Sequence, residues 1–277
     1  YRDIVGVNLA MDTVRSSGSR SYFGIDGDSI VPRVRTAFLE ITPLGRWLSL
    51  RGGMVPDLLL PVVERAWDLR ATGALGLERD GMATVADLGA SAEVALPFDL
   101  GSLALAYGNG EGVALREQNF GKNVTVALRL RPGRRRLPGL WLHALYRDGS
   151  LGVASAADRR VFGGILYSGG RLGLGAVGSY AMGFRGVGDR DAGELLLFAR
   201  GRLPYGVLLF GRAEVLWPDA RDAASQQLRV AAGLGYALPL LGRLHVAYDG
   251  TLARGALSQQ VPSVTEHALL VVAEARL

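Results

Sequence analysis

The residues able to carry acid–base or nucleophilic chemistry are few, and their spacing matches no catalytic site. His143, His245 and His267 have no metal-ligand spacing, and the absence of cysteine excludes thiolate sites and disulfides. Residues 173–178 are glycine-rich but are not followed by a helical pattern, so they predict no phosphate-binding loop. One pair, His267 beside Ser263, has the residue types of a phospholipase, but a single such pair arises easily by chance. We therefore expect no enzyme, no cofactor and no metal site.

Arginine supplies most of the positive charge. The chain has 31 basic and 26 acidic residues and a formal net charge of +5, and Lys122 is its single lysine. Many charged residues occupy alternate positions in strand-like segments, opposite an apolar face. The side chains expected to line an interior are Arg33, Arg35, Arg51, Asp87, Glu93, Arg129, Arg131, Arg147, Arg200, Arg212, Glu214, Arg229 and Arg243. Two interpretations stay open: the arginine excess favours anions, or the charges pair across strands and fill a wet interior.

Period-two alternation is the pattern that positions these charges. In 83–96, Leu88 and Val94 share one face while Asp87 and Glu93 share the other. Apolar runs are too short for a membrane-spanning helix of roughly 18 residues, whereas a tilted barrel strand needs only about 9–11. The alternation predicts strands near 3–13, 30–42, 45–54, 82–96, 101–108, 122–131, 139–147, 159–168, 171–184, 191–203, 205–217, 225–238, 241–253 and 264–277. A soluble sandwich or propeller would carry more Lys and Glu on its polar face.

Short and long links alternate between the predicted strands. That alternation is typical of an up-and-down barrel with short periplasmic turns and longer external loops. Residues 1–277 are therefore expected to form one domain, an all-β transmembrane antiparallel barrel of about fourteen strands with both termini periplasmic. Aromatic residues expected near the membrane interfaces on its outer face are Tyr107, Tyr146, Tyr180, Phe184, Trp217, Tyr236 and Tyr248.

The longest link, 55–81, carries an apolar stripe that a water-exposed loop should not have. Pro61 is placed to begin a short helix over 61–70. An exposed apolar stripe needs a partner, and two arrangements would provide one. The link folds into the barrel as a constriction lined by Glu64, Arg65, Asp68 and Arg70, or it packs over the rim or against a neighbouring protomer.

The segment from about 30 to 132 resembles outer-membrane porins of the phosphate-selective and related general type. The phrases that carry the resemblance are Pro-Arg-Val-Arg-Thr-Ala at 32–37, Leu-Ser-Leu-Arg-Gly-Gly-Met-Val-Pro at 48–56, Glu-Arg-Asp-Gly at 78–81, Val-Ala-Asp-Leu-Gly-Ala at 85–90, Leu-Ala-Tyr-Gly-Asn-Gly-Glu-Gly at 105–112 and Asn-Phe-Gly-Lys at 119–122. The chain departs from those porins in its smaller number of strands and in an ending without an aromatic residue.

The resemblance implies a passive channel for small hydrophilic or anionic solutes in the outer membrane of a Gram-negative bacterium. Its partners would be outer-membrane lipid and lipopolysaccharide, further copies of the chain or an envelope complex, and no nucleic acid. The alternative is a docking barrel of a motility or export machine with an occluded lumen. Inward Gly89, Ala104, Gly173, Gly175, Gly233 and Gly235 leave space, while Leu196, Phe198, Phe210 and Leu216 fill part of it. The basic patch 134–136 is expected to face acidic lipid or periplasmic surfaces.

Overall fold

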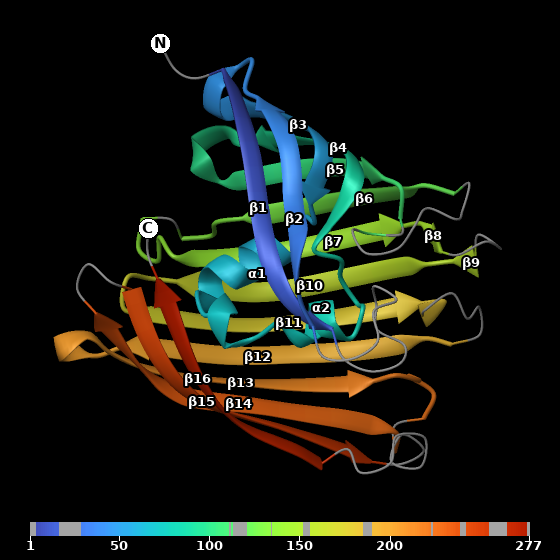
Figure 1. Ribbon diagram of the computed structural model, residues 1–277. Coiled ribbons are helices and arrows are strands. Elements are labelled where there is room, and N and C mark those ends of the chain that lie inside the picture. Colours follow the sequence, from blue (N-terminus) through green and yellow to red (C-terminus); the bar gives the residue numbers. More distant parts are fainter. Residues whose placement is uncertain are drawn as a thin grey trace.

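One curved antiparallel sheet makes up most of the protein (Figure 1). A computed structural model places residues 4–16, 29–110, 112, 121–133, 135–151, 156–184, 190–222, 224–238, 242–254 and 265–275. The sheet has fourteen strands: β1 (Val5–Ser16), β2 (Ser29–Ile41), β3 (Leu48–Pro56), β4 (Ala86–Ala95), β5 (Gly101–Gly108), β6 (Asn123–Leu130), β7 (Leu140–Asp148), β10 (Arg159–Ser168), β11 (Leu172–Met182), β12 (Ala192–Arg202), β13 (Val207–Trp217), β14 (Gln226–Leu238), β15 (Gly242–Arg254) and β16 (Thr265–Ala275).

The order of the strands in the sheet follows their order in the chain. The predicted all-β fold, with its fourteen strands and up-and-down connection, is thereby confirmed. A separate hairpin of β8 (Ser150–Leu151) and β9 (Ala156–Ala157) lies in one of the long links. The strand predicted near 82–96 begins only at Ala86, because Met82 and Ala83 are buried with the preceding link.

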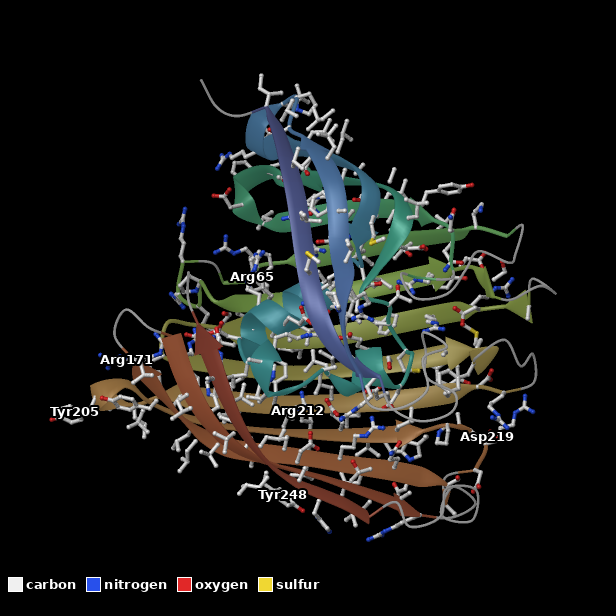
Figure 2. The ribbon with its side chains drawn as sticks, in the orientation of Figure 1. Arg65, Arg171, Tyr205, Arg212, Asp219 and Tyr248 are labelled. Carbon is white, nitrogen blue, oxygen red and sulfur yellow. The ribbon has the colours of Figure 1, made fainter. Side chains whose placement is uncertain are left out.

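The two faces of the sheet differ in polarity as the alternation predicts. Outward positions carry exposed apolar side chains such as Leu88, Ile165 and Leu234. Tyr107, Tyr146, Tyr180, Tyr236 and Tyr248 are exposed as expected, and Tyr248 projects from the outer surface in Figure 2. The expectation for Phe184 is wrong. Gly183, with φ 73°, turns the chain after β11, and Phe184 joins the buried core instead.

The link between β3 and β4 folds inside the curve of the sheet (Figure 1). It contains α1 (Leu60–Trp67), the 3₁₀ turn η2 (Arg70–Thr72) and the short α2 (Gly76–Arg79). Helix α1 lies against β10, β11 and β12. Of the two arrangements expected for this link, it adopts the inward one and does not pack over the rim. We call residues 57–85 the inner segment.

Strands β1 and β16 are the two ends of the strand order, and no pairing joins them among the residues that the structure describes. The inner segment lies at this seam. Turn η2 lies against β16, and the Arg70 guanidinium is 3.8 Å from the Asp12 carboxylate of β1. The remaining short turns include η1 (Gly45–Trp47), η3 (Pro97–Asp99) and η5 (Pro204–Gly206).

Candidate functional site

The start of the inner segment is fixed by Asp57, the first residue after β3. Its Oδ1 accepts hydrogen bonds from the backbone N–H groups of Leu59 (2.7 Å) and Leu60 (3.2 Å), which α1 leaves without intrahelical partners. Its Oδ2 accepts a hydrogen bond from Arg147 on β7. Pro61 occupies the first turn of α1, where its missing N–H costs nothing. One carboxylate therefore begins the helix and ties it to the wall.

The apolar face of α1 packs against the C-terminal half of the sheet. Trp67 has no exposed surface, and its ring makes edge contacts with Phe198 (5.5 Å between centroids) and Phe210 (5.9 Å). Leu60 and Val63 are fully buried beside it at helical spacing. The helix ends where Asp68 takes the left-handed conformation, with φ 56°. The expected end at residue 70 is thus three residues too late.

Two glycines of β11 make room for this packing. A Cβ at Gly173 would lie 2.6 Å from the Ala66 carbonyl oxygen, which also accepts a hydrogen bond from Arg200 Nε at 2.9 Å. A Cβ at Gly175 would collide with the Phe198 ring. These glycines do not leave open lumen. They are the surface onto which the inner segment and the aromatic rings fit.

Ion pairs attach the inner segment to the wall at points along its length. The pairs are Asp57 with Arg147, Glu64 with Arg35 (2.6 Å), Asp68 with Arg243 (3.0 Å), Arg79 with Glu214 (3.0 Å) and Asp80 with Arg229 (2.6 Å). Pairs of this kind add little net stability against an apolar alternative, but removing one partner leaves a buried charge. Their effect is to fix where the inner segment sits.

A carboxylate-rich network surrounds Arg70 near β1 and β2. Arg70 hydrogen-bonds to Glu78 and, at 2.6 Å, to Glu64, which also accepts from Arg35. Burial lowers the pKa of the Arg70 guanidinium, but the Glu78 hydrogen bond and the charges of Glu78, Glu64 and Asp12 outweigh burial and raise it above its ordinary value. Arg35 lies at the register shift of the β1–β2 ladder, where its backbone has no partner on β1, and its side chain points inward like that of Arg33.

A second buried polar cluster lies where α2 meets β12 and β13. The Gly76 N–H donates to Glu214 Oε1 at 2.7 Å, and a Cβ at Gly76 would lie 2.5 Å from Glu194 Oε1. Glu194 is 2% exposed, and neither of its oxygens has a hydrogen-bond partner among the described residues. Arg212 is similarly buried, and its guanidinium lies over the Trp67 ring. These side chains contact the inner segment, not an open pore.

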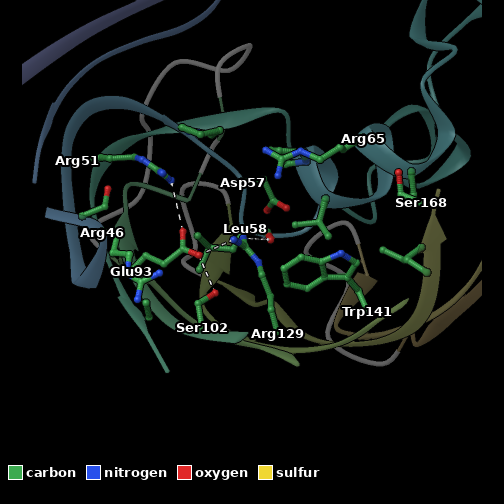
Figure 3. Close-up of a pocket in the computed structure, with 17 residues that line it drawn as sticks. Arg46, Arg51, Asp57, Leu58, Arg65, Glu93, Ser102, Arg129, Trp141 and Ser168 are labelled. Atoms are coloured by element: carbon green, nitrogen blue, oxygen red, sulfur yellow. Dashed lines mark hydrogen bonds and ion pairs between the residues drawn. The ribbon is translucent and has the colours of Figure 1, made fainter. Parts of the chain in front are cut away.

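A cavity of about 380 Å³ lies between α1 and the N-terminal half of the sheet (Figure 3). Glu93 accepts from Arg129 Nη1 at 2.9 Å and from the Ser102 hydroxyl at 2.7 Å, and Arg51 is 3.8 Å away. Trp141 forms part of the lining. Arg65 reaches the cavity from α1, is exposed, and has no hydrogen bond or ion pair with any described residue.

The predicted charged residues thus have two kinds of surroundings, and Arg129 has both because it also donates to the Leu58 carbonyl of the inner segment. Those that line the cavity are Arg51, Arg65, Glu93 and Arg129, and those held in pairs or contacts with the inner segment are Arg33, Arg35, Glu64, Asp68, Arg70, Arg147, Arg200, Arg212, Glu214, Arg229 and Arg243. Asp87 accepts from the Gly110 N–H at 2.6 Å. Arg131 stacks over Trp141 at 4.9 Å. Sequence reasoning did not name Asp57, Glu78 and Asp80 as site residues. Their signals were their place in an apolar link and, for Glu78 and Asp80, the phrase at 78–81.

The described residues offer little support for a metal site or for a catalytic Ser–His pair. The described residues contain no group of three or more His, Cys, Asp or Glu side chains placed to hold a metal ion. His267 Nδ1 and the Tyr248 hydroxyl form a hydrogen bond of 2.5 Å on the outer surface. Ser263 lies outside the described residues. No helix in the described part of the chain is long and apolar enough to cross a membrane.

Solved structures similar to this chain include porins and an outer-membrane protein. Salmonella typhi OmpF in complex with daunomycin matches with a TM-score of 0.66 and 14% identity, over 88% of this chain and 81% of that one. A porin refined at 1.8 Å matches with a TM-score of 0.56 and 13% identity, over 97% and 98%. OmpT of Vibrio cholerae, in its trimer form, matches with a TM-score of 0.54 and 13% identity, over 81% and 72%.

No family model and no curated protein sequence matches the chain. The structural likenesses show its fold, which is that of the outer-membrane porins. The porin-type barrel predicted from the sequence is therefore confirmed, whereas the resemblance to the phosphate-selective group stays a prediction.

Proposed function

We propose that the chain is a single-domain channel of a Gram-negative outer membrane that passes small hydrophilic solutes and prefers anions weakly. Its apolar outer face would meet lipid, its short turns and both termini would lie in the periplasm, and further copies of the chain would be its neighbours. The observation that carries the proposal is the cavity beside α1, where water and solute have room between the inner segment and the wall. The same arrangement supports a channel, and we propose no enzymatic activity for it.

The preference for anions rests on the charges that face this cavity. Glu93 is already neutralised by Arg129 and lies near Arg51. Arg65 has no paired carboxylate among the described residues, so its charge is directed at whatever enters. Arginines outnumber carboxylates in the cavity wall, and a wall with a net positive charge raises the local concentration of anions. The inner segment, which supplies Arg65, is thus proposed as the constriction.

Planar-bilayer recording tests the proposal. The purified protein is expected to give steady open steps, with a reversal potential under a salt gradient that indicates anions. Arg65→Glu should move that reversal potential toward the cation side, while Arg221→Glu, on an exposed long link, should leave it within error. Silence from folded, heat-modifiable protein would contradict the channel and favour the docking barrel. An unshifted reversal potential in Arg65→Glu would contradict only the role of Arg65.

A further inference from the structure

The short turns present aromatic side chains from a strained backbone. Phe98 has φ 58° and is 73% exposed, and Tyr205 has φ 61° and is 93% exposed. Each follows a Leu-Pro pair, at 96–97 and at 203–204. The left-handed region suits glycine or asparagine and is uncommon for a bulky residue. An exposed aromatic side chain held in this unfavourable conformation indicates that it contacts a partner outside the protein.

Other exposed apolar side chains lie on the same end of the barrel. They are Leu44 and Trp47 on the β2–β3 turn, Leu100 beside Phe98, Leu137 on the β6–β7 turn and Leu203 beside Tyr205. Apolar groups gathered at one rim of a protein mark a surface that contacts something other than bulk water.

The charge of the short turns is one-sided. Arginines stand on or beside these turns, namely Arg46, Arg131, Arg135, Arg136, Arg171 and Arg202, and among the described residues of the turns themselves only Asp99 is acidic, 3.2 Å from Arg46. The long-link end mixes both signs, as in the Arg159–Asp148 pair at 2.9 Å. Arg171 and Tyr205 project from one end of the barrel in Figure 2, and Asp219 lies at the other. We call residues 42–47, 96–100, 131–133, 135–139, 169–171 and 202–206 the short-turn rim.

We propose that the short-turn rim docks the headgroups of anionic phospholipids in the periplasmic leaflet. Guanidinium groups make charge-assisted hydrogen bonds to phosphate oxygens, and basic side chains near a membrane surface favour anionic lipid. Phe98, Tyr205 and the neighbouring leucines match the boundary between headgroup and acyl chain. These apolar tips favour lipid over an acidic polymer, because a polymer of that kind offers them nothing apolar. The inference rests on the proposed membrane location, but not on conduction.

Native mass spectrometry of the full chain in neutral detergent tests the arginines, with phosphatidylglycerol and phosphatidylcholine as competing probes. The wild type should retain phosphatidylglycerol at least about fivefold more strongly. Arg135→Gln/Arg136→Gln/Arg171→Gln should remove most of that preference, so that phosphatidylglycerol and phosphatidylcholine are retained nearly equally. The matched control, Arg190→Gln/Arg221→Gln/Arg254→Gln, removes the same charge from exposed positions at the opposite end and should change little. Equal loss in both variants, or loss in neither, would overturn the proposal, as would displacement of the lipid by polyglutamate.

A second variant separates lipid contact from folding. Asparagine accepts the left-handed conformation, so Phe98→Asn/Tyr205→Asn should keep or raise the melting temperature while lowering lipid retention several-fold. A lower melting temperature with intact retention would make the aromatic tips structural. Bilayer recordings on the same samples keep the two proposals apart. Conduction without lipid preference would refute this inference alone, and lipid preference without conduction would refute the channel alone.

Discussion

Replacing Trp67 with alanine should loosen the inner segment without unfolding the sheet. Trp67 is fully buried between α1 and the rings of Phe198 and Phe210. Truncating a buried tryptophan typically costs about 3–5 kcal/mol, because contacts are lost and a cavity is left. If that cost falls on docking of the segment, its undocked population rises about 10²- to 10³-fold, since about 1.4 kcal/mol corresponds to a factor of ten.

Two measurements on Trp67→Ala check this reasoning. Its free energy of unfolding in urea, measured in lipid vesicles, should fall by about 3–5 kcal/mol. Single-channel traces should show brief excursions to a larger conductance, as the segment leaves the lumen for short times. Trp67→Phe keeps most of the apolar volume and should show a smaller fall and rarer excursions. A fall in stability with unchanged traces would refute the idea that the segment moves separately from the sheet. No fall in stability would refute the packing argument itself.

Two further substitutions test the wall that receives the segment. Gly173→Val puts a side chain against the Ala66 carbonyl and should lower the free energy of unfolding by about 1–3 kcal/mol, whereas Gly178→Val in the same strand meets nothing within 4 Å and should not. Chemical denaturation of the pair checks this, and equal effects would contradict it. Asp80→Asn leaves Arg229, whose side chain is 13% exposed, without its carboxylate and should cost about 3–5 kcal/mol, against under about 1 kcal/mol for Asp148→Asn, which breaks the exposed pair with Arg159. A loss under about 1 kcal/mol in Asp80→Asn would contradict the pairing.

The strands were predictable because lipid and lumen place different demands on alternate residues. Segments such as 83–96 and 205–217 carry that alternation in full, and the links between strands keep their short–long order. Strand ends were less predictable. The strand expected to begin at residue 45 begins at Leu48, because residues 45–47 form a 3₁₀ turn that starts at Gly45 with φ 59°. The alternation of side chains gives no sign of this backbone conformation.

The site was less predictable, because its contacts join residues far apart in the sequence. The apolar stripe of 55–81 showed that the link needs a partner, but nothing in the stripe identifies Phe198 and Phe210 as that partner. Inward glycines such as Gly173 suggested empty space, since a missing side chain looks the same whether water or a helix fills the gap. The alternation placed Arg35 inward, but neither its partner Glu64 nor the register shift beside it has a signature in the alternation.

The burial of the inner segment also sets an order of assembly. The segment leaves the sheet after β3, yet the residues that cover it belong to β10, β11, β12 and β13, more than ninety residues further along the chain. The segment packs most directly while those later strands are still unpaired. We therefore expect it to lie on the inner side before they complete the curve, so that they form against a surface that is already in place. The segment would then act as an internal template, and variants that weaken it would slow the assembly of the C-terminal half before they alter the finished barrel.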